Sequence, residues 1–161
     1  MQRVAFELAL QTGQRGGDLV RLTRNDYRDG WIRLRQAKTR QPVDIPASAA
    51  LRAVLDPWIA GHDAVVILTT STGRAFQVDH FRHVMRDAYA AAGLPDDCTT
   101  HGLRYTTATV LAEQGCDWPT IAAVTGHRTA EMVRRYTSRL RRASAAIERL
   151  GNRSEKLSGG K

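Results

Sequence analysis

Apolar positions in the first third of the chain predict two short helices followed by a β-hairpin. Residues 2–12 carry apolar residues at helical spacing and end at a glycine, and residues 17–22 repeat that spacing over a shorter run. Residues 31–35 instead alternate with a period near two, and residues 42–46 follow after a polar turn. An antiparallel hairpin is therefore expected, and the two prolines of its second strand favour an edge position.

A third strand is expected further along the chain. Residues 51–59 carry apolar residues on one helical face, which predicts a helix that Pro57 kinks or shortens. Residues 64–70 form a short apolar run bounded by polar residues, and its shortness favours a buried strand over a helix. The small sheet would then have three strands.

The second half of the chain is predicted to be helical. Helices are expected over residues 78–92, 101–114, 118–124, 129–135 and 139–150, and residues 151–161 are expected to form a disordered tail. The expected fold class is mainly α with a small antiparallel three-stranded β-sheet (α+β), in one domain over residues 1–150.

Length and composition set limits on compartment and class. A chain of 161 residues fits one compact domain, and it contains no apolar run long enough for a membrane span. The first residues lack a signal-peptide pattern and two cysteines are too few for a disulfide framework, so a cytoplasmic location is expected. The first helix begins without a capping residue, which indicates a chain cut from something longer or one that lost its front.

The net charge of +8 is unevenly distributed. Residues 134–161 hold nine Lys and Arg against two acidic residues, whereas residues 1–133 hold fifteen against fourteen. A basic C-terminal quarter suggests a polyanionic partner. A solvated arginine-rich helix explains the same charge, and charge alone leaves both interpretations open.

A set of cationic and imidazole side chains surrounds one tyrosine in a pattern that suits attack on a phosphodiester. The candidate catalytic residues are Arg15, Lys38, His101, Arg104, His127 and Tyr136. Arginine suits the non-bridging oxygens because its planar fork meets two oxygens at once and keeps its proton. Arg15 and Arg104 are the candidates for this role, and His127 could donate a further hydrogen bond.

The tyrosine needs help from neighbours to act as a nucleophile. With a phenol pKa of ~10, only about one free tyrosine in a thousand is ionised at neutral pH. His101 can take the proton of Tyr136, and Lys38 in the hairpin turn can protonate the leaving 5′-oxygen. Each fragment is weak alone, because a lone lysine or tyrosine is more often a surface or core residue. A zinc site from Cys98, His101 and Cys116 lacks a fourth ligand, so buried thiols are preferred.

The order and spacing of these fragments resemble the tyrosine recombinases, the phage-integrase family. Residues 12–19 (TGQRGGDL) resemble the family's TGxRxxEL box, and residues 101–104 (HGLR) resemble its HxLR box. Gly126-His127, followed nine residues later by Tyr136, matches the GHxxxxxxxxY box, and Lys38-Thr39 resembles the "KT" of its hairpin. The resemblance covers residue 4 to about residue 150.

The resemblance implies a DNA strand-breaking and rejoining enzyme that forms a 3′-phosphotyrosyl intermediate without metal or cofactor. It assigns the roles given above, makes Asp18 an acidic support of the site, and makes double-stranded DNA the partner. Arginines expected to contact DNA are Arg128, Arg134, Arg139, Arg141 and Arg142. The helix over residues 139–150 resembles the segment that such proteins pass to a neighbouring protomer. The family's N-terminal core-binding domain is expected to be absent from this chain.

Two residues depart from the family's pattern. Tyr105 stands where histidine usually follows the HxLR box, which places a competing phenol beside the site, and Thr125 replaces the usual leucine before Gly-His. Two alternatives remain: a type IB topoisomerase-like nicking and resealing enzyme, and a non-catalytic DNA-binding remnant of an integrase.

Overall fold

The computed structural model describes residues 1–131, which form a mainly helical fold around a small antiparallel sheet, as expected from the sequence. The elements in chain order are α1 (Gln2–Thr12), α2 (Gly16–Leu19), the 3₁₀ turn η1 (Arg24–Asp26), β1 (Tyr27–Arg28), β2 (Trp31–Arg35), β3 (Pro42–Pro46), α3 (Ala49–Ala60), α4 (Val78–Ala91), α5 (Thr100–Glu113) and α6 (Trp118–Thr125). The helix predicted over residues 139–150 and the tail over residues 151–161 lie outside the described residues. Within the described part, no helix has the length and apolar character needed to cross a membrane.

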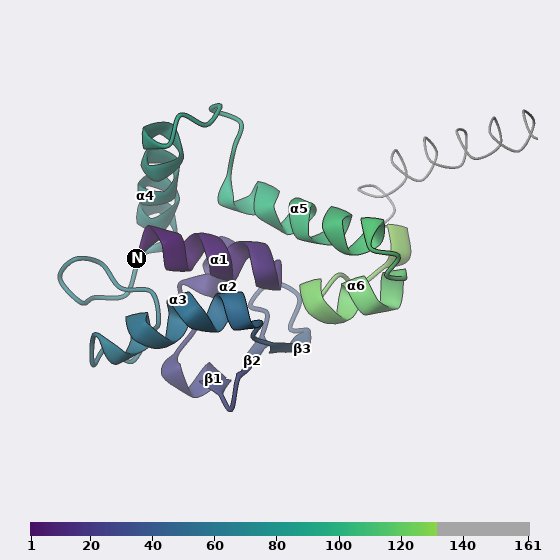
Figure 1. Ribbon diagram of the computed structural model, residues 1–161, viewed down its shortest axis with the longest axis horizontal. Helices are drawn as coiled ribbons and strands as arrows, with labels where there is room; N and C mark the ends of the chain where they lie inside the picture. The colour runs from purple at the N-terminus through teal and green to yellow at the C-terminus, as the bar shows by residue number, and fades with distance from the viewer. Residues whose placement is uncertain (132–161) are drawn as a thin grey trace, which may run out of the picture.

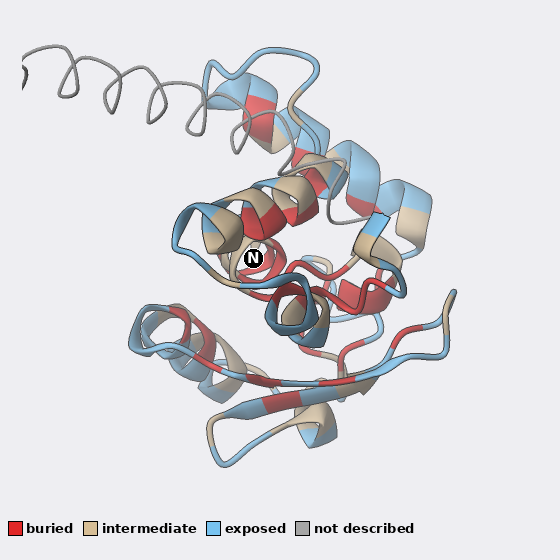
Figure 2. Ribbon diagram, turned by 90° about the vertical axis from the view of Figure 1, so that its right-hand side faces the viewer, coloured by how far each residue is buried: buried red, intermediate tan, exposed pale blue. Residues whose placement is uncertain are grey.

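Helix α1 is the central element of the fold. It lies between α5 and α3 (Figure 1), and it packs against both. Its buried residues include Val4 and Leu8, one helical turn apart, which face a core that occupies the middle of the molecule (Figure 2). Gly13 ends α1 with a φ of 62°, and its N–H donates to the Ala9 carbonyl at 2.9 Å. Arg15 follows two residues after Gly13, so this turn sets its position.

The predicted hairpin is confirmed. Strands β2 and β3 pair antiparallel, with Ile32 opposite Ile45 and Leu34 opposite Val43. Ile32, Val43 and Ile45 are buried, so one face of the hairpin covers the core while the other is solvated. The turn between the strands holds Lys38.

The position predicted for the third strand is wrong. The third strand is β1, which pairs with the other edge of β2, whereas residues 64–70 form only isolated bridges, Thr23 with Val66 and Thr69 with Ala75. Ile67 and Leu68 are completely buried, so the apolar run correctly indicated burial. The run forms no ladder because each bridge joins it to a single residue, Thr23 after α2 and Ala75 further along the same loop, and neither residue belongs to a strand.

Two helices differ from their predicted lengths. The segment expected over residues 17–22 is a single turn, α2, and α3 continues past Pro57 to Ala60, so the proline does not shorten it. Pro57 lies in the last turn of α3, and the helix ends at Gly61 as the sequence indicated.

The helix that carries His101 and Arg104 has a polar cap whose removal should be measurable. Thr99 precedes α5, and its hydroxyl accepts a hydrogen bond from the Gly102 N–H at 3.0 Å. Replacing Thr99 with alanine should lower the free energy of unfolding by about 1 kcal/mol, because one N–H of the first turn loses its partner. Urea denaturation measures this loss, and Thr99→Ser should retain most of the wild-type stability. Equal loss in both variants would mean that the threonine methyl, not the cap, is what matters.

Candidate active site

A buried guanidinium joins three elements of the fold. Arg104 on α5 is only 1% exposed, and its Nη1 donates to the Gly13 carbonyl at 2.7 Å and to the Thr125 carbonyl. Burial of a charge is costly unless hydrogen bonds replace its water, and these two carbonyls provide such bonds. Arg104 thereby fixes α5 to the end of α1 and to the end of α6.

A buried glutamine connects the hairpin to the same point. Gln36 follows β2 and is completely buried. Its Nε2 donates to the Thr125 carbonyl at 2.8 Å and to Gln14 Oε1 at 2.7 Å. Its Oε1 accepts from Arg15 Nη1 at 3.0 Å and from Thr39 Oγ1 at 2.7 Å. Because the Thr125 carbonyl can only accept and the Arg15 guanidinium can only donate, the amide nitrogen of Gln36 must face Thr125 and its oxygen must face Arg15.

Gly126 leaves the space that this glutamine occupies. Its φ is 70°, a left-handed conformation that glycine adopts without steric cost. A Cβ at this position would overlap the side-chain amide of Gln36, so no other residue fits without displacing that amide. The glycine before His127 is therefore required both by the backbone and by Gln36.

Asp18 supports Arg15 and the residue that precedes Lys38. Its carboxylate is buried; Oδ1 accepts from the Ala37 N–H at 2.8 Å, and Oδ2 lies 3.9 Å from Arg15 Nη1. Such charge-assisted bonds are stronger than neutral ones. The aspartate therefore couples the first arginine to the hairpin turn.

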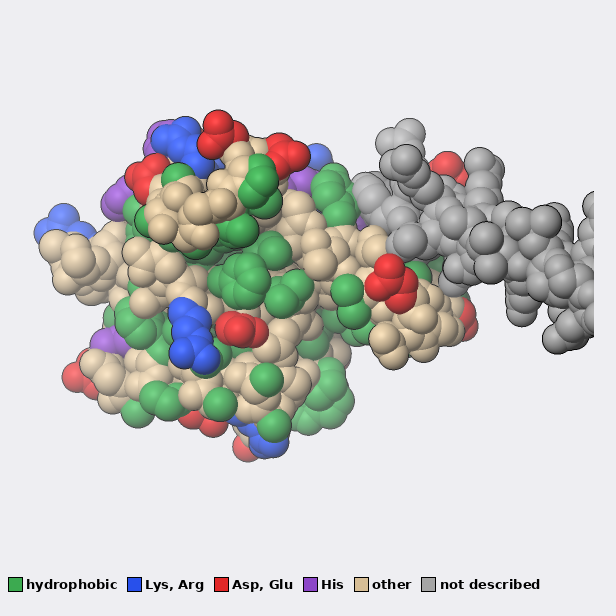
Figure 3. Space-filling model, turned by 45° about the horizontal axis from the view of Figure 1, so that its top comes forward, with side chains coloured by type: hydrophobic (Ala, Val, Ile, Leu, Met, Phe, Trp, Pro, Cys, Tyr) green, Lys and Arg blue, Asp and Glu red, His purple; other side chains and the backbone are tan. Residues whose placement is uncertain are grey.

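A hollow of about 810 Å³ opens in front of these residues, between α2, α4 and the start of α5. Three predicted catalytic residues line it, namely Arg15, Lys38 and His101. Basic side chains from elsewhere also line it; these are Arg21, Arg82, His83 and Arg86, with Asp18, Asp79 and Asp96 as the acidic ones. Figure 3 shows basic, acidic and histidine side chains gathered on the surface over α4.

His101 lies on the wall of this hollow, in contact with the second phenol of the region. Its Nε2 is 2.9 Å from the Tyr105 hydroxyl, one helical turn further along α5. Burial lowers the pKa of His101 below its ordinary value, and the charges of Arg104, Arg15, Lys38 and Arg82 lower it further. A neutral imidazole of this kind can accept a proton.

His127 is not among the residues that line the hollow, and it is almost completely buried. Burial lowers the pKa of this ring to about 4, and the charges of Arg104 and Arg15, followed by His101, act in the same direction. Its Nδ1 lies 2.6 Å from the Thr125 hydroxyl. The ring is therefore neutral at physiological pH and oriented by a neighbour.

The structure brings together the predicted residues that it describes, and it adds others. Arg15, Lys38, His101, Arg104, His127 and Asp18 gather at this place, and Arg128 is exposed directly after His127. Tyr136, Arg134, Arg139, Arg141 and Arg142 lie outside the described residues. Sequence reasoning missed Gln14 and Gln36, although Gln36 continues the inward positions of Ile32 and Leu34 along β2. A polar residue at an inward-facing position of the strand was the feature of the sequence that could have identified Gln36.

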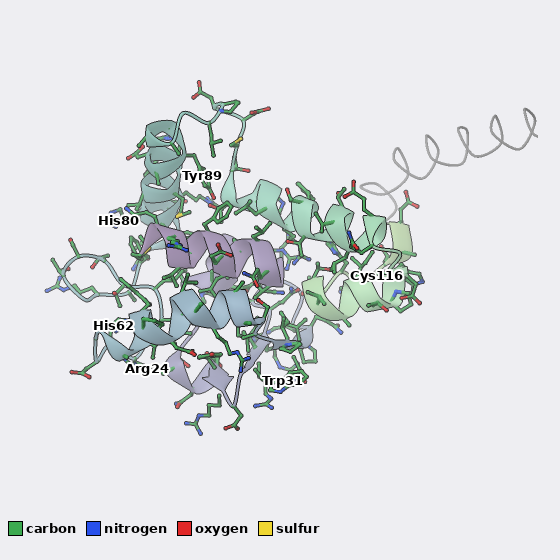
Figure 4. The ribbon with its side chains drawn as sticks, viewed as in Figure 1. Arg24, Trp31, His62, His80, Tyr89 and Cys116 are labelled. Carbon is green, nitrogen blue, oxygen red and sulfur yellow. The ribbon has the colours of Figure 1, made fainter. Side chains whose placement is uncertain are left out.

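Of the three residues considered for zinc, Cys98 and His101 line the same hollow, but Cys116 is far from both. His101 is the second residue of α5 and Cys116 follows the end of this helix, so nearly the whole length of α5 puts roughly 20 Å between them. Cys116 lies at the opposite end of α5 from Tyr89, which sits between α4 and the start of α5 (Figure 4). Among residues 1–131, no group of three or more His, Cys, Asp or Glu side chains could hold a metal ion.

Comparison with known proteins gives one consistent result. The model of the phage integrase family matches residues 1–142. A tyrosine recombinase XerC of Rhodospirillum centenum is 30% identical over 141 residues, which cover 84% of this chain and 41% of the relative. This chain thus spans less than half of that relative's length.

Solved structures of the same family share the fold. A lambda integrase dimer bound to a COC′ core site is 27% identical, with a TM-score of 0.73 over 84% of this chain and 41% of that one. The catalytic core of lambda integrase is also 27% identical, with a TM-score of 0.67 over 80% of this chain and 81% of that one. The three boxes, the shared fold and the family match agree: this chain belongs to the phage integrase family.

Proposed function

We propose that residues 1–150 form the catalytic domain of a site-specific DNA recombinase, in which Tyr136 attacks the scissile phosphodiester. The observation that carries this proposal is the convergence of Arg15, Arg104 and His127 on one hydrogen-bonded centre, beside a hollow lined by Lys38 and His101. Family membership and the likeness to the lambda integrase catalytic core support it.

The two guanidiniums are suited to the charge that develops during the reaction. The pentacoordinate transition state of a phosphodiester carries about two negative charges, and fixed donors aimed at its oxygens stabilise it without reorganisation. Arg15 is held by Gln36 and Asp18, and Arg104 is held by two carbonyls. Because their positions are fixed before substrate binds, the site spends little free energy on ordering them.

In the proposed reaction every bond and proton has a partner. The phenol oxygen of Tyr136 bonds to phosphorus while its proton passes to an imidazole, for which His101 is the candidate on the wall of the hollow. The bond from phosphorus to the 5′-oxygen breaks, and Lys38 supplies the proton that this oxygen takes. The 3′-phosphotyrosyl bond preserves the energy needed for rejoining. In the second step the 5′-hydroxyl of another strand bonds to this phosphorus and gives its proton to the neutral Lys38. The bond from phosphorus to the Tyr136 oxygen breaks, and that oxygen takes its proton back from His101.

We propose double-stranded DNA as the substrate, lying across the hollow in contact with α4. The basic side chains of α4 support this placement, since Arg82 and Arg86 line the hollow and pair only with exposed acids of their own helix in the described part of the chain. Arg128 and the arginines after residue 133 would extend the contact. We also propose that the protein associates with itself on DNA through residues 139–150, and the lambda integrase solved as a dimer on DNA is a precedent for this association. The proposed location is the cytoplasm.

Replacing Tyr136 with phenylalanine should abolish covalent attachment to DNA, because only the attacking oxygen is lost. Incubation with a nicked suicide substrate followed by a denaturing gel measures the attachment. Filter binding should show unchanged non-covalent affinity. Attachment at the wild-type level would refute Tyr136 as the nucleophile and direct attention to Tyr105, which already contacts His101. Attachment followed by relaxation of supercoiled DNA without strand exchange would favour the topoisomerase-like alternative.

Lys38 allows a test of the leaving-group proton. Lys38→Ala should cut ordinary DNA about 10²-fold more slowly, the lower end of what general acid catalysis contributes. In a substrate with sulfur in place of the bridging 5′-oxygen, the leaving 5′-thiolate needs no proton. On this substrate the variant should therefore approach the wild-type rate. Equal impairment on both substrates would mean that the lysine binds phosphate and is not the acid.

The arginines of α4 should govern the salt dependence of DNA binding. If Arg82 and Arg86 bind phosphates, replacing both with glutamine should reduce the slope of log affinity against log salt by about 0.9 for each phosphate that the protein no longer neutralises. The matched control is Arg33→Gln, an exposed arginine that stacks on Trp31 on the sheet, away from the hollow. A slope that changes as much in the control as in the double variant would contradict the placement of DNA along α4.

A further inference from the structure

The hydroxyl of Thr125 makes two short contacts, and it can donate its single proton in only one of them. Thr125 Oγ1 lies 2.7 Å from the Ile121 carbonyl, one helical turn back in α6, and 2.6 Å from Nδ1 of His127. Thr125 is completely buried, so bulk water does not compete for either contact. A hydroxyl offers one proton and can accept others.

The chemistry of the two partners decides where the protons lie. A carbonyl oxygen can only accept, whereas Nδ1 of an imidazole can either donate or accept. Both contacts of Thr125 are satisfied only when its hydroxyl donates to the Ile121 carbonyl, 2.7 Å away. The contact with His127 then needs a proton from the ring. That proton is on Nδ1.

We infer that Thr125 is a positioning residue that keeps the ring proton of His127 on Nδ1 and leaves Nε2 as a hydrogen-bond acceptor. The neutral state of the ring at physiological pH is consistent with this assignment, since a neutral imidazole carries only one N–H. The leucine that usually occupies this position in the family has no hydroxyl.

The inference changes the part that His127 can play, and for this consequence it rests on the proposed function. The sequence suggested a hydrogen bond donated by His127 to the phosphate. With its proton on Nδ1, the neutral ring cannot donate from Nε2, and it does so only after Nε2 has taken up a proton. His127 therefore becomes a second acceptor for the proton of the attacking phenol, beside His101, whose Nε2 contacts Tyr105.

Nitrogen NMR of the whole chain tests the assignment without DNA. Long-range ¹H–¹⁵N spectra near neutral pH distinguish a protonated ring nitrogen from a bare one, and the His127 signals are identified by their loss in His127→Asn. The expected result is a protonated Nδ1 and a bare Nε2. A ring with its proton on Nε2 would overturn the inference directly.

Variants of Thr125 test the cause. Thr125→Val keeps the shape and the backbone carbonyl but removes the hydroxyl, so the proton should move to Nε2. Thr125→Ser should keep the proton on Nδ1. The matched control, Thr107→Val, removes another buried helical hydroxyl, which lies 2.6 Å from the Leu10 carbonyl and 2.8 Å from the Leu103 carbonyl and can donate to one of them at a time. It should leave the His127 signals unchanged. A Val variant with an unchanged tautomer would overturn the role of Thr125. If Thr125→Val does not fold, Thr125→Ala takes its place, since it removes the same hydroxyl and should show the same move of the proton to Nε2.

DNA cleavage tests the catalytic consequence separately. Thr125→Val should cut about 10²-fold more slowly near neutral pH, with recovery in Thr125→Ser, because loss of one proton acceptor has that order of effect. Wild-type cleavage by the Val variant, with its tautomer shifted, would refute the acceptor role. If Tyr136→Phe still attached to DNA while the NMR result held, the proposed function alone would fail and the tautomer assignment would stand.

Discussion

The carbonyl oxygen of Thr125, at the end of α6, is the acceptor on which the geometry of the site depends. It receives hydrogen bonds from Arg104 and from Gln36, which come from α5 and from the hairpin. The last carbonyls of a helix have no partner within the helix and carry the negative end of its dipole. They are therefore suited to hold a buried guanidinium, and here one such carbonyl aligns three parts of the chain.

The guanidiniums of Arg15 and Arg104 also influence the two histidines before any substrate binds. Burial lowers the pKa values of His101 and His127, and the positive charges of Arg104 and Arg15 lower them further. Both imidazoles are thus available as proton acceptors. An anion bound between the guanidiniums would offset their charge and raise both pKa values, so substrate binding and proton affinity are coupled.

The sequence was most informative where residues act through spacing. Alternation over residues 31–35 and 42–46 predicted the hairpin, and the boxes around Arg15, Arg104 and His127 predicted a shared centre. Spacing said nothing about how that centre is held together. Gln36 looked like an ordinary polar residue near a turn, and its role depends on contacts across 89 residues of chain to Thr125. Residues 64–70 misled for a related reason, since an apolar run reports burial and not the partner it will meet.

The sequence distances spanned by these hydrogen bonds bear on when the site is assembled. Arg104 reaches back 91 residues to Gly13, and Gln14 reaches forward 110 residues to the Val124 carbonyl. Contacts of this range close large loops, and loop closure is slow and costly in chain entropy. The centre therefore forms only when α6 docks onto the rest of the fold, and a local opening of α6 would dismantle it while leaving α1 and the sheet packed. Competence for chemistry is in this sense a late product of folding, and it would be the first property to disappear on partial unfolding.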